Sequence, residues 1–231
     1  MLILDYWWQL LLFGIAIYLI SNVNYAIILT KIFKKQDIRK VGSGNPGTTN
    51  TLRCFGFGLG LAVFVCDAIK GVCAVAIGLW LFPWVVGNDT IGLFASYFFS
   101  LCSVLGHVFP VFLKFHGGKG FASSIGLFSM LNPIFSLGGL IVGFALLLLT
   151  DFMSLFAMFY VTLQFAFAGL ILFTNASLIS EIAVGSFVCA GLIWVIVIFS
   201  HRQNIVRLIK GKENPSRVRE MLFKRKKTEN N

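Results

Sequence analysis

Long apolar runs follow one another along most of the chain, separated by short polar segments. Most are about 20 residues long or longer, which a helix needs to cross about 30 Å of hydrocarbon. Only 12% of the residues are charged, against about 25% in soluble proteins. The runs are too long for barrel strands, so we predict an all-α polytopic integral membrane protein. They are Tyr6–Leu29, Phe55–Val86, Ile91–Leu113, Phe121–Leu131, Ile134–Thr150, Leu155–Phe173 and Ile182–Phe199.

The most glycine-rich polar segment, Gly42–Arg53, lies between the first two runs. It reads Gly-Ser-Gly-Asn-Pro-Gly-Thr-Thr-Asn-Thr-Leu-Arg. Its glycines, proline and asparagines predict a tight loop that cannot be a regular helix. Backbone N–H groups in such a loop can converge on an oxyanion. Ser43 and Arg53 add a hydroxyl and a guanidinium suited to phosphate, although an ordinary surface turn gives the same pattern.

Two ionisable residues, Asp67 and Lys70, interrupt the second run. Such groups inside a span are costly and indicate function by default. The helix from Lys70 to Val86 would be about 25 Å long, which places both residues near the surface that carries the glycine-rich loop. Because they are three residues apart, they can pair on one helix face. We favour a structural pair that supports the loop over a direct substrate contact.

The run Phe121–Leu131 is short for a span and ends at Asn132-Pro133. Either it crosses and the chain returns, or it forms one long kinked segment with the next run. If it crosses, there are about seven spans, and four polar clusters lie on the same side. These clusters are Gly42–Arg53, His107–Gly120, Thr150–Ser154 and Ser200–Asn204. With six spans this convergence fails, so we predict seven.

The basic residues support the same arrangement. Six of the 19 Lys and Arg lie in the first loop, two in the second polar cluster and ten in the tail from residue 201, while Lys70 is the remaining one. By the positive-inside rule the N-terminus is outside, and the polar clusters and C-terminus are cytoplasmic. We therefore expect a single membrane-embedded domain over residues 1–200, followed by a last motif and a basic cytoplasmic tail over residues 201–231.

The converging clusters are cationic, rich in neutral hydrogen-bond donors and poor in acids, which suits phosphate groups. We expect no metal site, since Asp67 and Asp151 are too few and the three histidines share no ligand spacing. The five cysteines form no C-x-x-C and resemble small core residues. A nucleotide P-loop, a G-x-S-x-G elbow and a His-x4-Asp pattern are all missing. The net charge of +10 flanks the spans, so we expect no nucleic-acid partner.

Three separated segments, in order, resemble the motifs of the bacterial acyl-phosphate:glycerol-3-phosphate acyltransferases of the PlsY type. The first is Gly-Ser-Gly-Asn-Pro-Gly-Thr-Thr-Asn, residues 42–50. The second combines Gly-His-Val-Phe-Pro-Val-Phe, residues 106–112, with Phe-His-Gly-Gly-Lys-Gly-Phe-Ala-Ser, residues 115–123. The third is His-Arg-Gln-Asn-Ile-Val-Arg-Leu-Ile-Lys-Gly, residues 201–211. The resemblance spans nearly the whole chain.

This resemblance implies transfer of a fatty acyl group from acyl phosphate to the 1-hydroxyl of sn-glycerol 3-phosphate. The products would be lysophosphatidic acid and phosphate, in the first step of phospholipid synthesis. It implies a multi-pass protein of the bacterial plasma membrane whose active face is cytoplasmic. No cofactor is expected, and we expect a monomer surrounded by membrane lipids.

The site residues that follow from the resemblance fall into two groups. The loop from Ser43 to Gly47 would hold the acyl-phosphate head through N–H groups and the Ser43 hydroxyl. The phosphate of the acceptor would be held by Arg53, Lys119, Ser154, His201 and Asn204. Catalytic roles are assigned to Ser43, Lys119 and His201, and substrate-binding roles to Gly44, Asn45, Gly47, Asn50, Arg53, Ser154 and Asn204. For His107 two roles are open, support of the site residues from behind or capping of the third span, and we favour the structural, capping role.

The sequence leaves the general base open. His201 is one candidate, and the phosphate of the acceptor is the other. It also leaves competing functions open. A phosphate-ester transporter would need polar groups along a path through the membrane, whereas here they gather at one face. An acyltransferase that uses acyl-CoA or acyl carrier protein is the enzymatic alternative, because the basic tail Arg217–Lys227 could attract an acidic carrier. We favour an anionic-lipid-binding segment for that tail.

Overall fold

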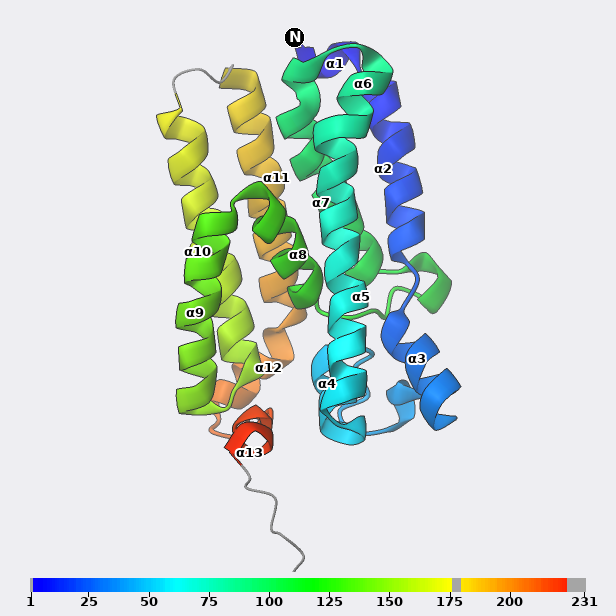
Figure 1. The fold of residues 1–231 in the computed structure, drawn as a ribbon, viewed down its shortest axis with the longest axis vertical. Helices are drawn as coiled ribbons and strands as arrows, with labels where there is room; N and C mark the ends of the chain where they lie inside the picture. The colour runs from blue at the N-terminus through cyan, green and yellow to red at the C-terminus, as the bar shows by residue number, and fades with distance from the viewer. Residues whose placement is uncertain (1, 176–179, 224–231) are drawn as a thin grey trace, which may run out of the picture.

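The computed structural model describes residues 2–175 and 180–223, and within these ranges it contains helices and loops but no strand (Figure 1). Parts of two predicted segments, the turn Thr174–Glu181 and the basic tail Arg217–Lys227, lie outside the described residues. The helices are α1 (Leu2–Asp5), α2 (Trp7–Ser21), α3 (Tyr25–Lys34), α4 (Thr48–Phe55), α5 (Phe57–Ala76), α6 (Phe82–Val86), α7 (Gly92–Val108), α8 (Phe121–Leu131), α9 (Pro133–Thr150), α10 (Met153–Thr174), α11 (Ser180–Ser200), α12 (Arg202–Ile209) and α13 (Val218–Phe223). Short 3-10 turns are η1 (Ile38–Lys40), η3 (Asp89–Ile91) and η4 (Val111–Leu113), and a π-helical turn, η2 (Ile77–Leu81), joins α5 to α6.

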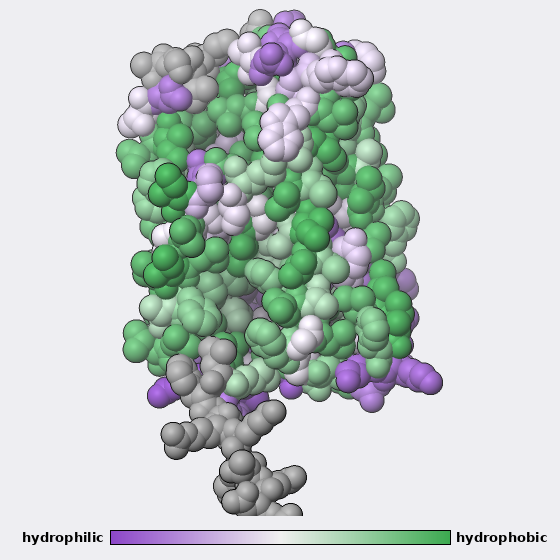
Figure 2. All heavy atoms as spheres, viewed as in Figure 1, coloured by the Kyte–Doolittle hydropathy of each residue, from purple (hydrophilic) through white to green (hydrophobic). Residues whose placement is uncertain are grey.

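Six helical segments in the described residues are long and apolar enough to cross a membrane, which confirms the predicted fold class. They are Trp7–Lys34, Phe57–Val86, Asp89–Leu113, Pro133–Thr150, Met153–Thr174 and Glu181–Ser200. Hydrophobic residues cover the middle of the molecule, and hydrophilic residues gather at its two ends (Figure 2). Such an exposed apolar band is the surface that lipid tails cover.

The seventh segment, α8, is an 11-residue apolar helix, about 16 Å long at 1.5 Å per residue. It turns back into α9 at Asn132-Pro133 and ends well short of the bundle end where α1 and α6 lie (Figure 1). The hydroxyls of Ser129 and Ser136 lie 2.9 Å apart across this hairpin. The chain therefore reverses after α8, as predicted, and the alternative of one long kinked segment is wrong, while a membrane crossing by α8 itself stays a prediction.

Glycines allow α8 to lie directly on α5. A Cβ at Gly71 would collide with the backbone of Ser123, and one at Gly126 would collide with the backbone of Ala68. Small residues allow membrane helices to approach backbone to backbone, where dispersion contacts replace the missing hydrophobic drive. This close contact places the start of α8, and Lys119 just before it, beside α5.

The structure corrects the prediction that the whole segment Gly42–Arg53 is a loop. The irregular part ends at Gly47, which precedes α4, and Thr48–Phe55 is helical. The prediction was wrong because the three glycines and the proline all lie within residues 42–47, whereas residues 48–55 contain neither of these two strongest helix breakers. Gly42 and Gly44 have φ values of 61° and 73°, the left-handed conformation that glycine adopts without strain.

Candidate functional site

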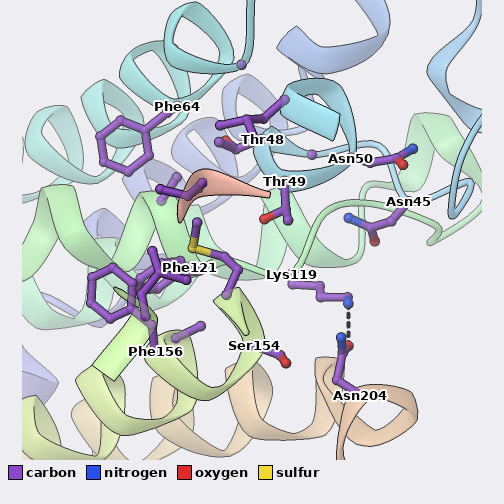
Figure 3. Close-up of a pocket in the computed structure, with 18 of the residues that line it drawn as sticks. Asn45, Thr48, Thr49, Asn50, Phe64, Lys119, Phe121, Ser154, Phe156 and Asn204 are labelled. Carbon is purple, nitrogen blue, oxygen red and sulfur yellow. Dashed lines mark hydrogen bonds between the residues drawn. The ribbon is translucent and has the colours of Figure 1, made fainter. Parts of the chain in front are cut away.

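A cavity of about 570 Å³ is lined by residues of all four predicted polar clusters. Lys119, Ser154 and Asn204 come from three different segments and meet on one side, near Asn45 and Thr49 (Figure 3). Phe64, Phe121 and Phe156 lie together on the other side (Figure 3). The cavity therefore joins a polar, cationic end to an apolar wall.

The structure brings together most of the predicted site residues. Those that line the cavity are Ser43, Asn45, Gly47, Asn50, Arg53, Lys119, Ser154, His201 and Asn204. Gly44 is not among the lining residues, and its N–H donates to the Val41 carbonyl at 3.1 Å. Asp67 and His107 line the cavity as well.

The N–H groups of the glycine-rich loop are largely used within the loop itself. Ser43 donates its N–H to the Asn50 side chain at 2.9 Å, and Gly47 donates to the Asn45 carbonyl at 3.0 Å. The helical ladder of α4 begins only at Thr51, which donates to the Gly47 carbonyl. The preceding N–H groups of Thr48 and Thr49 have no intrahelical acceptor and lie at the positive end of the helix dipole. An anion in this part of the cavity would thus meet the start of α4.

Asn50 braces the loop. Its amide nitrogen donates to the carbonyls of Ile38 (3.3 Å) and Val41 (3.0 Å), while its oxygen accepts from Ser43. The side chain is almost fully buried, and its hydrogen-bonding capacity is nearly exhausted. We therefore expect Asn50 to shape the site, not to bind substrate as the sequence suggested.

Lys119 is the cation at the centre of the polar end. Its ammonium donates to the Asn204 side-chain oxygen (Figure 3). Burial, together with the nearby positive charge of Arg207, lowers its pKa from the usual 10.5 to about 8. The group is therefore mostly protonated at pH 7 and loses its proton above pH 8. Since an ammonium that is partly stripped of water gains strongly from an anionic ligand, this end of the cavity favours phosphate or carboxylate.

Glu213, which the sequence did not single out, organises the same end. Its carboxylate accepts from Ser154 Oγ (3.1 Å), Asn204 Nδ2 (2.6 Å) and Arg207 Nε (2.9 Å). Only 8% of the residue is exposed. Its sole signal in the sequence is that it is an isolated acid in a basic tail, two residues beyond the last motif.

Arg53 binds the chain segment that follows Glu213. Its guanidinium donates to the carbonyls of Pro215 (2.8 Å) and Asn214 (3.1 Å). Ser216 donates its hydroxyl to Asp151 Oδ1 (2.5 Å) and its N–H to the Asp151 carbonyl (2.7 Å). Val218 is buried and lines the cavity. Glu213 and Val218 thus form part of the cavity wall, and we call residues 213–218 the C-terminal strap.

His201 is buried and held in one tautomer. Its Nδ1 lies 2.8 Å from the Val197 carbonyl, so Nδ1 carries the proton and Nε2 is the free nitrogen of a neutral ring. Burial lowers its pKa from 6.5 to about 4, and the charge of Lys119 acts in the same direction. A ring with so low a pKa is a weak base near neutral pH.

Comparisons with known proteins agree on one family. The sequence model described as glycerol-3-phosphate acyltransferase matches residues 11–211. A glycerol-3-phosphate acyltransferase of Thermoanaerobacter pseudethanolicus is 40% identical over 202 residues, which cover 87% of this chain and 92% of the relative. A glycerol-3-phosphate acyltransferase 2 of Bacillus anthracis is 38% identical, with coverage of 85% and 94%.

Two solved structures are similar over nearly the whole fold. Both are crystal structures of PlsY, described as an integral membrane glycerol 3-phosphate acyltransferase. The glycerol 3-phosphate form is 31% identical with a TM-score of 0.77, covering 93% of this chain and 99% of that one. The lysophosphatidic acid form is 30% identical with a TM-score of 0.73, covering 90% and 95%.

Proposed function

This chain belongs to the glycerol-3-phosphate acyltransferase family, and on that premise we propose that its acyl donor is an acyl phosphate. The acyl group passes to the 1-hydroxyl of sn-glycerol 3-phosphate, which gives lysophosphatidic acid and inorganic phosphate. The observation that carries the proposal is the cavity itself, since one space holds both an apolar wall and a polar end rich in cations and neutral donors. The tail of a lipid donor fits the apolar wall, and its phosphate head fits the start of α4. A small dianion fits the polar end.

The two phosphate groups are assigned to different parts of the polar end. Thr48 and Thr49 N–H groups and the Ser43 hydroxyl hold the head of the acyl phosphate, at the positive end of α4. Lys119, Ser154 and Asn204 hold the phosphate of the acceptor, with Arg53 and His201 beside them. Both substrates are then held in one cavity, and holding reactants in the correct geometry supplies a large part of the rate acceleration.

The chemical step needs few protein groups, because acyl phosphate is already activated. The 1-hydroxyl oxygen attacks the carbonyl carbon, a tetrahedral intermediate forms, and the bond from that carbon to the phosphate oxygen breaks. The hydroxyl proton passes to the phosphate group of the acceptor. His201 is unsuited to take it, since its pKa is near 4 when the site is empty, and a bound phosphate that raised this pKa would do so by favouring the protonated ring, which cannot accept a further proton.

The active face is proposed to be cytoplasmic. The helices α3 and α12, which carry basic residues, lie at the same end of the bundle as α4, whose first residues line the cavity (Figure 1). Basic residues concentrate on the cytoplasmic side of membrane proteins. A soluble phosphate ester can enter from that side, while a lipid donor enters from the bilayer. We also infer that one chain suffices, because segments of a single chain supply every group assigned above.

The donor is tested with purified protein supplied with sn-glycerol 3-phosphate and, separately, palmitoyl phosphate, palmitoyl-CoA or palmitoyl carrier protein. We expect lysophosphatidic acid only with palmitoyl phosphate, with one phosphate released per product. Product from either thioester would overturn the donor assignment and keep the acceptor assignment. No product from any donor, with folded protein, would favour transport of phosphate esters.

The route of the proton is tested by His201→Gln. We expect the KM for sn-glycerol 3-phosphate to rise about tenfold, because one polar contact to the phosphate is weakened. The kcat is expected to stay within about threefold of wild type, since no proton passes through the imidazole. Steady-state kinetics at pH 7 measure both values, and a fall in kcat of a hundredfold or more would restore His201 as the general base.

A further inference from the structure

Three ionisable residues are buried in the bundle beside the cavity, outside the set assigned to the two phosphates. Asp67 is 2% exposed, Lys70 8% and His107 5%. Asp67 Oδ1 lies 3.1 Å from Lys70 Nζ and 3.5 Å from His107 Nδ1. A buried ion pair adds little stability over apolar residues of the same volume. Its presence inside a membrane bundle therefore calls for a role beyond holding the fold together.

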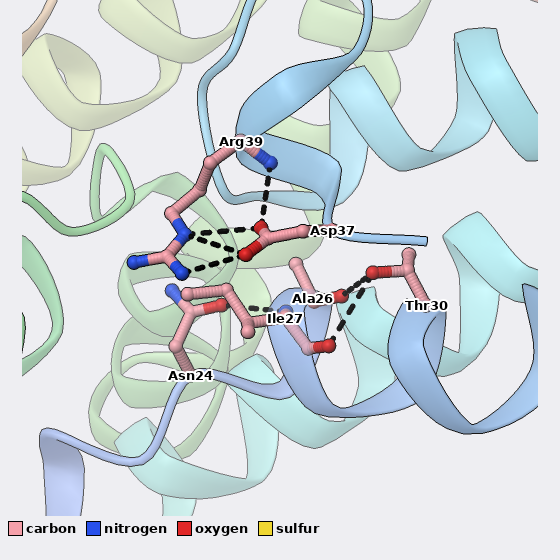
Figure 4. A network of polar contacts seen from close by, with 6 residues as sticks. All are labelled: Asn24, Ala26, Ile27, Thr30, Asp37 and Arg39. Atoms are coloured by element: carbon pink, nitrogen blue, oxygen red, sulfur yellow. Dashed lines mark hydrogen bonds and ion pairs between the residues drawn. The ribbon is translucent and has the colours of Figure 1, made fainter. Parts of the chain in front are cut away.

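Lys70 connects this cluster to the glycine-rich loop. Its ammonium donates to the carbonyls of Ser21 (3.3 Å), the last residue of α2, and Val23 (2.5 Å), in the break between α2 and α3. The next residue, Asn24, donates its amide to the Pro46 carbonyl (3.0 Å) and caps α3 by accepting from Ile27 (Figure 4). Lys70 thus holds the backbone just before Asn24, and Asn24 in turn binds the glycine-rich loop that leads into α4.

His107 connects the cluster to the second glycine-containing loop. Its carbonyl accepts from the Gly118 N–H at 3.1 Å, and the Val108 carbonyl accepts from Gly117 at the same distance. A Cβ on Gly118 would overlap His107 Nε2, so the imidazole is packed directly against the loop. Lys119 is the next residue along. The position of His107 thus helps to set where Lys119 enters the cavity.

We propose that Asp67 is a positioning residue that holds the two substrate-binding loops in register, one through Lys70 and the other through His107. The proposal rests on the proposed function, in which the loop before α4 orients the acyl donor and Lys119 holds the acceptor. Each loop can bind its own phosphate without Asp67. Their relative placement, which decides the approach of the hydroxyl to the carbonyl, depends on this one carboxylate. This agrees with the sequence-based expectation of an Asp67–Lys70 pair and adds His107 to it.

The test separates positioning from folding by removing both charges of the pair. Asp67→Asn alone leaves Lys70 buried without its counter-ion, so we expect lower thermal stability as well as lower activity. The double variant Asp67→Asn, Lys70→Met removes that penalty and is expected to regain most of the thermal midpoint. Its kcat is expected to stay about a hundredfold below wild type, while the KM values for palmitoyl phosphate and sn-glycerol 3-phosphate change less than about threefold. A double variant that regains both stability and kcat would overturn the proposal.

A second variant and a control complete the experiment. His107→Gln keeps an amide near the position of Nε2 and loses the contact with Asp67, so kcat is expected to fall at an unchanged thermal midpoint. A wild-type kcat in His107→Gln would also overturn the proposal. Asp37→Asn breaks the solvent-exposed pair with Arg39, 2.6 Å long (Figure 4), and should change neither stability nor kcat. Wild-type protein is assayed in parallel. If the wild type shows no turnover, the proposed function fails; if only the comparison among the variants fails, the positioning role of Asp67 fails.

Discussion

Lys119→Met is expected to lower kcat/KM for sn-glycerol 3-phosphate about a thousandfold. The variant keeps the length of the side chain and loses the ammonium, which is partly buried and donates to Asn204. A charge-assisted hydrogen bond to phosphate in such a site contributes about 4 kcal/mol, and each 1.36 kcal/mol changes the rate about tenfold. Release of phosphate from palmitoyl phosphate, followed at subsaturating acceptor, measures the effect.

Lys119→Arg is the matched control, because it keeps the positive charge and removes the titration. The pKa of Lys119 is lowered to about 8, so wild-type kcat/KM should fall as pH rises through 8 and the ammonium loses its proton. An arginine stays protonated throughout this range, and the profile of Lys119→Arg should stay flat there even if its maximum is lower. Activity of Lys119→Met within tenfold of wild type, or a fall above pH 8 that persists in Lys119→Arg, would remove Lys119 from the site.

Glu213→Ala is expected to lower kcat/KM about a hundredfold and to lower the thermal midpoint. The carboxylate accepts from Ser154, Asn204 and Arg207, so its loss leaves three donors without their shared acceptor. Each buried donor left unsatisfied costs about 1–3 kcal/mol. Of the three donors, the partly exposed Arg207 adds least to this cost, because water reaches it. Steady-state kinetics and thermal unfolding in the same detergent measure the two effects.

Glu213→Gln separates the charge of this residue from its shape. The amide oxygen still accepts a hydrogen bond, but its nitrogen faces other donors, so we expect losses smaller than in the alanine variant. An alternative is that the carboxylate competes with the phosphate of the substrate for the same donors. In that case Glu213→Ala would lower the KM for sn-glycerol 3-phosphate at an unchanged thermal midpoint, and our interpretation would be wrong.

The sequence predicted the membrane class, the order of the segments and the convergence of the polar clusters. These depend on the lengths of the apolar runs and on whether an even or odd number of them separates two polar clusters. Details that depend on local competition were harder to predict. Pro133 is compatible with both a kink and a reversal, and the hairpin is visible only once α8 packs on α5 through Gly71 and Gly126. The helix α4 was missed because the glycines of residues 42–47 dominated the whole window.

Site residues with motif neighbours were predictable, and those defined only by distant contacts were not. Lys119, Ser154, His201 and Asn204 line the cavity as expected. Glu213 meets Ser154, a residue 59 positions away, so nothing near it in the sequence reveals its partners. The roles of Asn45 and Ser43 toward the substrates stay predictions. Asn50 shows that a polar residue in a binding loop can serve to hold that loop.

The C-terminal strap has a practical consequence for anyone who handles this protein. The shared family region ends at Gly211, which invites truncation at that point. Such a cut would delete the acceptor of Ser154 and Asn204, release Arg53 from Pro215 and remove the partner of Asp151. Affinity tags and reporter fusions therefore belong after Phe223, because a boundary drawn from sequence similarity alone would remove part of the cavity wall.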